Sequence, residues 1–160
     1  MIRKAEVKDI PRIAEIIVFG KRVAYRDIFK NDLESFQHLQ VVDLANKLYE
    51  DSKLLDTMLV YDDGIIKGVI NRKYEEDGIE IHDFYVEPFF KGLGIGTQLL
   101  ERLIQEAKQQ NFKCIYLWVI GENVEARKFY ERNGFRATGK TDIIEGTDKL
   151  DVHYELLLGK

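Results

Sequence analysis

The sequence contains one cysteine, Cys114, and only two prolines, Pro11 and Pro88, among its 160 residues. A lone cysteine cannot form an internal disulfide. The lack of disulfides is typical of proteins in a reducing compartment. No stretch approaches the roughly 20 apolar residues that cross a bilayer, and the first residues lack the apolar core and cleavage site of a secretory leader. A disulfide scaffold and a membrane anchor are therefore not expected, and the expected location is cytoplasmic.

An excess of positive charge is also lacking. The chain has 24 Lys and Arg residues against 28 Asp and Glu residues, a formal net charge of −4, and the two signs are interleaved. A nucleic-acid-binding protein normally shows a basic stripe, because phosphate neutralisation dominates its affinity. No nucleic-acid partner is expected. The mild acidity suits a cationic amine, but it is common enough to decide little.

Linkers and internal repeats are missing as well. No Ser-, Gly- or Pro-rich stretch divides the chain, so a single domain over residues 1–160 is expected. A domain of this length buries enough surface to fold without disulfides or metals.

Apolar periodicity predicts the elements of the first third. A short strand is expected at Ile2–Val7, followed by a helix that Asp9 caps and that runs toward Val23. A loop is expected at Arg26–Leu33, and a second helix at Ser35–Leu48.

The middle of the chain alternates as strands do. Thr57–Tyr61 and Ile65–Lys73 flank an Asp-Gly turn, and Ile79–Val86 forms a third strand. A glycine-rich segment then leads into a helix whose apolar positions are Leu99, Leu100, Leu103, Ile104 and Ala107.

The last third predicts a buried strand, a helix and two more strands. The continuous apolar run Cys114–Ile120 is typical of a buried, parallel position. Asn123 is expected to cap a helix that ends at Gly134, and strands are expected at Phe135–Ile143 and Val152–Leu158. The predicted class is α+β, with a mixed, mostly antiparallel central sheet and helices on both faces.

The glycine-rich segment Lys91–Gly96 lies between a strand and a helix. Its exposed backbone N–H groups at the positive end of the helix would suit a diphosphate, although a turn that merely reverses the chain is the alternative. A P-loop would need a lysine after Gly96, where Thr97 stands. The dinucleotide fingerprint would need a glycine at Thr97 or Leu99, and the following strand lacks a ribose-binding acid.

Two motifs in the right order resemble the GNAT superfamily of N-acetyltransferases. Phe84–Gly96 is similar to its acetyl-CoA motif, a strand ending in Val-x-Pro, then Arg/Gln-x-x-Gly-x-Gly/Ala and a helix. The second half also matches, with Leu117-Trp118-Val119 followed by Asn123-x-x-Ala126-x-x-Phe129-Tyr130-x-x-x-Gly134-Phe135. The resemblance is specific from about Gly78 to Phe135, and it implies a GNAT-like fold with acetyl-CoA as cosubstrate.

The resemblance also implies where acetyl-CoA binds. The pyrophosphate is expected on the backbone amides of Lys91–Thr97, and the pantetheine arm beside the backbone of Tyr85 and Val86. Lys91 departs from the family's Arg or Gln: it keeps the positive charge and lacks the planar fork of donors. The cofactor-binding residues implied are Phe84, Tyr85, Val86, Lys91, Gly92, Leu93, Gly94, Ile95, Gly96, Thr97, Asn123, Ala126, Phe129 and Tyr130.

Amide formation from a thioester needs a proton donor for the leaving thiolate. The resemblance gives this role to Tyr130, in the Phe-Tyr position of the second motif. The alternative is an aromatic ring that only packs beside Phe129.

The amine acceptor must also lose a proton, since an alkyl ammonium has a pKa near ~10.4. Glu80 occupies the register in which some family members hold their catalytic carboxylate. Alternation places Glu80, His82, Phe84 and Val86 on one strand face, so His82 is a rival or a relay, whereas Asp83 points away. The alternative is that both are polar residues of a half-exposed strand.

The remaining candidates give no site. Cys114 is interpreted as a small core residue, because no neighbouring basic group would lower the pKa of its thiol. His38 and His153 lack metal-ligand spacing, so no metal is expected.

The expected function is acetyl transfer to a small-molecule or peptide amine, directly within a ternary complex and away from membranes. A non-catalytic acyl-CoA sensor and a structural domain with a simple glycine turn are the alternatives. The resemblance implies that the first two helices and the loop between them, here Gly20–Phe36, select the acceptor with help from the final strands. The alternative is that this loop is an ordinary solvated loop. Arg22 and Arg26 would favour an acceptor carrying a carboxylate, whereas an acidic wall would favour polyamines. The acceptor's identity and a homodimer are left open.

Overall fold

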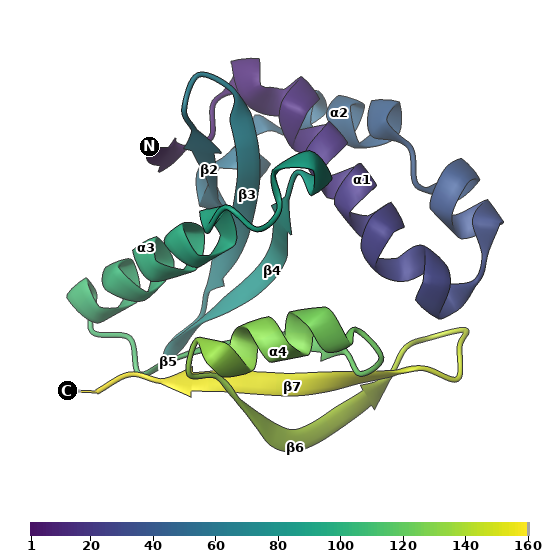
Figure 1. Ribbon diagram of the computed structural model, residues 1–160. Helices are drawn as coiled ribbons and strands as arrows, with labels where there is room; N and C mark the ends of the chain where they lie inside the picture. The colour runs from purple at the N-terminus through teal and green to yellow at the C-terminus, as the bar shows by residue number, and fades with distance from the viewer. Residues whose placement is uncertain (160) are drawn as a thin grey trace. The chain divides into compact units, whose positions relative to one another are not determined.

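The described residues, 1–159 of the computed structural model, form seven strands and four α-helices (Figure 1). In chain order these are β1 (Ile2–Lys4), α1 (Ile10–Phe29), α2 (Val41–Glu50), β2 (Met58–Asp62), β3 (Ile66–Tyr74), β4 (Gly78–Val86), α3 (Ile95–Gln109), β5 (Cys114–Ile120), α4 (Val124–Arg132), β6 (Arg136–Ile143) and β7 (Leu150–Leu157). None of these helices is both long enough and apolar enough to span a bilayer.

The strands form one sheet in the order β1-β2-β3-β4-β5-β7-β6. β4 and β5 are parallel, whereas β1–β2, β2–β3, β5–β7 and β6–β7 are antiparallel. The predicted α+β class with a mixed, mostly antiparallel sheet is therefore confirmed.

The chain divides into two compact units. The first unit contains Met1–Arg72 and Asp83–Arg102, and the second contains Lys73–His82 and the chain from Leu103 onward. β3, β4 and α3 contribute residues to both units, so the units alternate along the sequence rather than follow one another.

The core of the first unit lies between α1, α2 and one face of the β2–β3 hairpin. It consists of Ile10, Ile13, Ile16, Ile17, Leu48, Leu55, Met58, Val60, Ile66 and Val69. The isoleucines of α1 recur every three or four residues and so form one helix face, as the sequence predicts.

The opposite face of β3 carries α3. A Cβ added to Gly68 would lie 2.9 Å from Leu99 Cδ1 and 3.0 Å from Ile95 Cγ2, so only glycine allows the first turns of α3 to approach so closely. Helices therefore cover both faces of the hairpin, as expected.

Two predictions about the first unit's helices are wrong. α1 continues to Phe29, beyond the predicted end near Val23, and stops where Lys30 adopts the left-handed conformation, with φ 53°. The predicted helix Ser35–Leu48 is interrupted: a π-helical turn spans Glu34–His38, and α2 begins at Val41.

Arg22 explains the interruption. Its guanidinium donates to the carbonyls of Ser35 at 2.8 Å and Leu39 at 3.0 Å, and it lies over the rings of Phe19 and Phe36. These contacts hold the π-helical turn against α1. They also engage two carbonyl groups that, in a continuous helix, would accept hydrogen bonds from N–H groups of the next turn.

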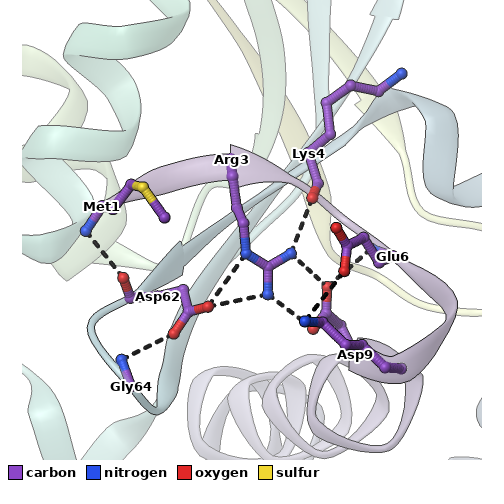
Figure 2. A network of polar contacts seen from close by, with 8 residues as sticks. Met1, Arg3, Lys4, Glu6, Asp9, Asp62 and Gly64 are labelled. Carbon is purple, nitrogen blue, oxygen red and sulfur yellow. Dashed lines mark hydrogen bonds and ion pairs between the residues drawn. The ribbon is translucent and has the colours of Figure 1, made fainter.

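The predicted strand Ile2–Val7 ends at Lys4, because a polar network fixes the next turn (Figure 2). Asp9, which is buried, accepts two hydrogen bonds from Arg3, at 2.8 and 2.9 Å, and one from the Glu6 N–H at 2.8 Å. Arg3 also donates to Asp62 at 3.0 and 3.1 Å. Asp9 was predicted to cap α1, but its carboxylate is engaged in this network and makes no capping bond to the helix.

Asp9→Asn is expected to destabilise the protein by about 3 kcal/mol near neutral pH, because it leaves the Arg3 charge with one carboxylate instead of two. Burial opposes ionisation of Asp9, but the bonds from Arg3 and Glu6 outweigh it and lower its pKa. A lowered pKa contributes stability that is present above the unfolded value of about 3.9 and is lost as the pH falls through the folded value.

Urea unfolding at several pH values measures this effect. The difference between wild type and Asp9→Asn should shrink below about pH 4. The matched control is Asp63→Asn at the exposed Asp63–Lys67 pair, which should stay near wild-type stability. A pH-independent deficit would contradict the role of the ionised Asp9.

Candidate functional site

The glycine-rich segment has the backbone conformation that its sequence predicts. A short 3₁₀ turn at Pro88–Phe90 ends at Lys91, and Gly92 and Gly94 then have φ angles of 81° and 79°. Nothing lies within 4 Å of a Cβ added at either glycine, so glycine is needed for its conformation and not for space. α3 begins at Ile95, and its first N–H groups have no partner within the helix itself.

The turn before the loop is fastened to the rest of the first unit. The buried Glu87 forms an ion pair with Arg12 of α1 at 3.2 Å, and its N–H donates to the Lys67 carbonyl at 2.8 Å. The Lys67 ammonium lies 4.5 Å from the centre of the Phe90 ring. The sequence does not indicate the Arg12–Glu87 ion pair, because it joins residues 75 positions apart.

The three motif residues at the end of β4, Phe84, Tyr85 and Val86, are half-buried. Tyr85 packs on α1: a Cβ added to Gly20 would lie 2.6 Å from its ring, and its hydroxyl is 2.9 Å from that of Tyr25. A glycine inside a helix is unfavourable by itself, so Gly20 was the available signal for this close approach.

The second unit carries the second motif on α4. The Asn123 side chain accepts a hydrogen bond from the Ala126 N–H at 3.2 Å, so the predicted cap is confirmed. Gly134 has φ 91°, which confirms the predicted left-handed stop. Tyr130 is 8% exposed and makes edge-on ring contacts with Phe129 and Phe135, at centroid distances of 5.5 and 5.6 Å.

α4 lies along one face of the second unit's strands (Figure 1). The Tyr154 hydroxyl of β7 donates to Glu131 of α4 and accepts from Arg127 of α4, both at 2.9 Å. The register places Tyr154 beside Leu117, and Leu117 beside Ile81, so these side chains share the face that α4 covers.

Glu80 and His82 lie on the other face. Glu80 precedes Ile81 in β4 and therefore points away from α4, and its Oε1 is 3.0 Å from His82 Nε2. The structure thus brings the two base candidates together, while within the second unit Tyr130 belongs to the helix on the opposite side. Asp83, expected to point away from them, is an ion-pair partner of Lys21 at 3.9 Å and accepts from Asn71 at 3.4 Å.

β5 is not buried on both faces, contrary to the prediction. Ile115, Leu117 and Val119 are buried on the α4 side, but Tyr116 on the other side is half-buried and Trp118 is 38% exposed. Apolar composition alone cannot distinguish these cases, because aromatic rings also line open sheet faces. The pKa of Tyr116 is raised mainly by its burial, and the nearby charge of Glu80 raises it further.

Two other expectations concern Cys114 and metals. Burial, with the charges of Glu155 and Asp77, raises the pKa of the Cys114 thiol, so the reactive thiolate is disfavoured. Within residues 1–159, no three His, Cys, Asp or Glu side chains are grouped so that they could hold a metal ion.

A strand, a glycine loop and a helix follow one another in this order, and an Asn-capped helix with a buried tyrosine comes later in the chain, as the two sequence motifs predict. The family model described as "Acetyltransferase (GNAT) family" matches residues 22–135. The chain therefore belongs to the acetyltransferase (GNAT) family. At the level of the family, the expected enzyme class and the expected cosubstrate, acetyl-CoA, are confirmed.

Individual relatives agree with the family match. The chain is 40% identical over 67 residues, 42% of its length, to an uncharacterized N-acetyltransferase of Methanocaldococcus jannaschii, and the match covers 28% of that protein. It is 32% identical over 77 residues, 44% of its length, to the spermine/spermidine N(1)-acetyltransferase of Bacillus subtilis, covering 50% of that protein. The matched segments cover between 28% and 57% of the length of the first curated relatives.

A solved structure shows the same fold over the whole chain. The PaiA N-acetyltransferase of Thermoplasma acidophilum, in complex with coenzyme A, superposes with a TM-score of 0.76 at 20% identity, and covers 99% of this chain and 98% of its own.

Proposed function

We propose that this chain transfers an acetyl group from acetyl-CoA to an amine, directly within a ternary complex. The observation that carries the proposal is the glycine loop: Gly92 and Gly94, both with positive φ, precede the N-terminus of α3. Such a loop presents backbone N–H groups to a diphosphate at the positive end of a helix. The family model runs through both compact units, which supports their belonging to a single acetyltransferase domain.

In this proposal the protein's own residues bind and orient the cosubstrate. The amides of Lys91–Thr97 hold the pyrophosphate, and the backbone of Tyr85 and Val86 lies beside the pantetheine arm. The tight packing at Gly68 and the Arg12–Glu87 pair support the proposal, because they fix both ends of the loop to the first unit. A loop fixed in advance loses little conformational entropy when it binds.

The chemistry balances without a covalent enzyme intermediate. The amine nitrogen attacks the thioester carbonyl carbon, and the tetrahedral intermediate then breaks its C–S bond. Before the attack, the ammonium gives one proton to Glu80, directly or through water. As the C–S bond breaks, the thiolate takes a proton from the Tyr130 hydroxyl, and the proton that the new amide nitrogen must lose restores that hydroxyl through water.

The acceptor proposed is a small-molecule or peptide amine. The relative that acetylates spermine and spermidine supports a polyamine as one candidate. Arg22 and Arg26 are poor candidates for holding an acceptor carboxylate, since Arg22 donates to two carbonyls and Arg26 is paired with Asp32 at 2.8 Å. These two arginines therefore give no evidence for an acceptor that carries a carboxylate.

Thiol release from acetyl-CoA tests the proposal, with a panel of polyamines, amino acids, aminoglycosides and peptides as acceptors. Amine-dependent release is the expected result. If acetyl-CoA raises the melting temperature while no amine stimulates release, the chain is a sensor of acyl-CoA instead. If acetyl-CoA leaves the melting temperature unchanged, the loop is only a turn.

Glu80→Gln is expected to lower the rate about tenfold at neutral pH, less than for a base in direct contact, because water can lie between the two groups. The deficit should shrink as the pH approaches the pKa of the amine, since the substrate then arrives already deprotonated. The pH profile of kcat with the best acceptor of the panel measures this.

His82→Ala should be mild, and Asp83→Asn is the matched control for a neighbouring carboxylate held by Lys21 and Asn71. If Glu80→Gln keeps the wild-type pH profile of kcat and His82→Ala loses the acidic limb of that profile, then His82 and not Glu80 is the base.

A further inference from the structure

His153 of β7 is a buried polar residue that the proposed mechanism does not use. It is 7% exposed, and its Nδ1 lies 2.8 Å from the Thr138 hydroxyl of β6. Nε2 has no hydrogen-bond partner among residues 1–159. It is not completely enclosed by protein atoms, so solvent can reach it. Because Nε2 is not fully enclosed, it can form a hydrogen bond with water or with a bound molecule.

The contact with Thr138 orients the ring. The Thr138 hydroxyl can donate to the His153 carbonyl oxygen, which lies 3.5 Å away. The hydroxyl oxygen also accepts a hydrogen bond from the Lys140 N–H at 3.3 Å. This arrangement allows Nδ1–H to donate to Thr138, and in that tautomer Nε2 carries the lone pair.

The open nitrogen belongs to the face that carries Glu80. Tyr154 faces α4, so the adjacent His153 faces away from it, and its register partner is Trp118. The imidazole lies 4.9 Å from the Trp118 ring and 5.4 Å from the Tyr116 ring, centre to centre. Tyr116 is in turn the register partner of Glu80.

The surroundings suit a cation. Glu80 of β4 and Glu155 of β7 both interact with His153 electrostatically, and each raises its pKa, whereas Lys140 of β6 lowers it. His82, beside Glu80, is the other titratable group on this face of β4. Burial is the largest influence and gives a net lowering of the His153 pKa, so the imidazole is neutral at neutral pH. Two carboxylates and two aromatic rings favour an ammonium group next to a neutral imidazole.

We propose that His153 binds the acceptor: its Nε2 accepts a hydrogen bond from the amine nitrogen on the sheet face that carries Glu80. This inference rests on the proposed function and adds to it a second polar contact for the amine. Glu80 receives the proton, and His153 holds the nitrogen while it does so. The acceptor class that this contact selects is a primary amine or ammonium with a slender chain that fits beside aromatic rings.

The kinetic test compares wild type with His153→Phe, which keeps an aromatic ring beside Tyr116 and Trp118 and removes the acceptor nitrogen. With the best amine of the panel, and with spermidine as a fixed probe, kcat/KM for the amine should fall about tenfold or more, as for loss of a hydrogen bond to a charged group. KM for acetyl-CoA should not change. Thr138→Val should give an intermediate loss of kcat/KM, because the His153 ring is then no longer held by a hydroxyl. Thr138→Ser keeps the hydroxyl and should therefore keep the wild-type kcat/KM.

The pH dependence distinguishes binding from packing. Because its pKa is lowered, His153 should stay neutral until the pH falls below about 6.5, and kcat/KM for the amine should decline as it becomes protonated. The chain has three histidines, His38, His82 and His153, so NMR titration with single variants assigns each pKa. The kinetic pKa should match that of His153, and this limb should be absent in His153→Phe.

The outcomes separate the two proposals. If the wild type releases no thiol with any amine, the proposed function fails and this inference fails with it. If the wild type is active and a folded His153→Phe keeps wild-type kcat/KM for the amine and its acidic limb, only the role of His153 is overturned. If His153→Phe does not fold, the Thr138 pair decides: equal activity of Thr138→Val and Thr138→Ser overturns the inference.

Discussion

Tyr130→Phe is expected to lower kcat by about 10²-fold while KM for acetyl-CoA stays close to wild type. The hydroxyl is proposed to protonate the departing thiolate of coenzyme A, a step that the ring itself cannot assist. Phenylalanine keeps the edge-on contacts with Phe129 and Phe135, so the variant should remain folded. Single-turnover measurements, in which chemistry limits the rate, give the clearest comparison.

The matched control is Tyr154→Phe. Tyr154 is also buried, and its hydroxyl bonds to Arg127 and Glu131 of the same helix that carries Tyr130. Loss of that hydroxyl should reduce stability by about 1 kcal/mol or more and leave kcat unchanged. If Tyr130→Phe instead turns over at the wild-type rate, Tyr130 only packs, and the thiolate leaves with a proton from water.

Elements that depend on local chemistry were predictable from the sequence. Asn123 caps α4 and Gly134 ends it, because a side-chain acceptor and a left-handed residue act within one helical turn. The strand Cys114–Ile120 was predicted with its observed bounds. The glycine loop could be placed for the same reason, since Gly92 and Gly94 are needed for their own φ angles.

Features that depend on distant partners could not be predicted. Arg22 interrupts the helix expected after Ser35 through carbonyls 13 and 17 residues away. Asp9 looks like a helix cap in the sequence, but Arg3, Glu6 and Asp62 determine its environment. Composition cannot report such contacts, because they form only after strands and helices have packed together.

The candidate site was predicted in the same uneven way. The two motifs contain the residues proposed to hold acetyl-CoA, whereas His153 belongs to neither motif. Its pairing with Trp118 across β5 and β7, and with Thr138 across β6 and β7, depends on a register that the sequence does not reveal. Long-range strand order is thus what separates the recognised part of the site from the missed part.

Gly94→Val is expected to abolish measurable binding of coenzyme A while the protein stays folded. Gly94 has φ 79°, a conformation that costs about 1–2 kcal/mol for residues with a Cβ and more for a β-branched one. Valine should therefore shift the backbone into an allowed region and re-aim the amides that precede α3. Calorimetric titration with coenzyme A measures the affinity, and the rise in melting temperature that the ligand gives the wild type should disappear.

Gly146→Val is the matched control, because it imposes the same kind of strain elsewhere. Gly146 lies between β6 and β7 with φ 78°, and nothing lies within 4 Å of an added Cβ at either position. Both variants should lose similar stability, but Gly146→Val should bind coenzyme A as the wild type does. A folded Gly94→Val with wild-type affinity would show that the diphosphate does not depend on this loop, and binding at the N-terminus of α3 would have to be abandoned.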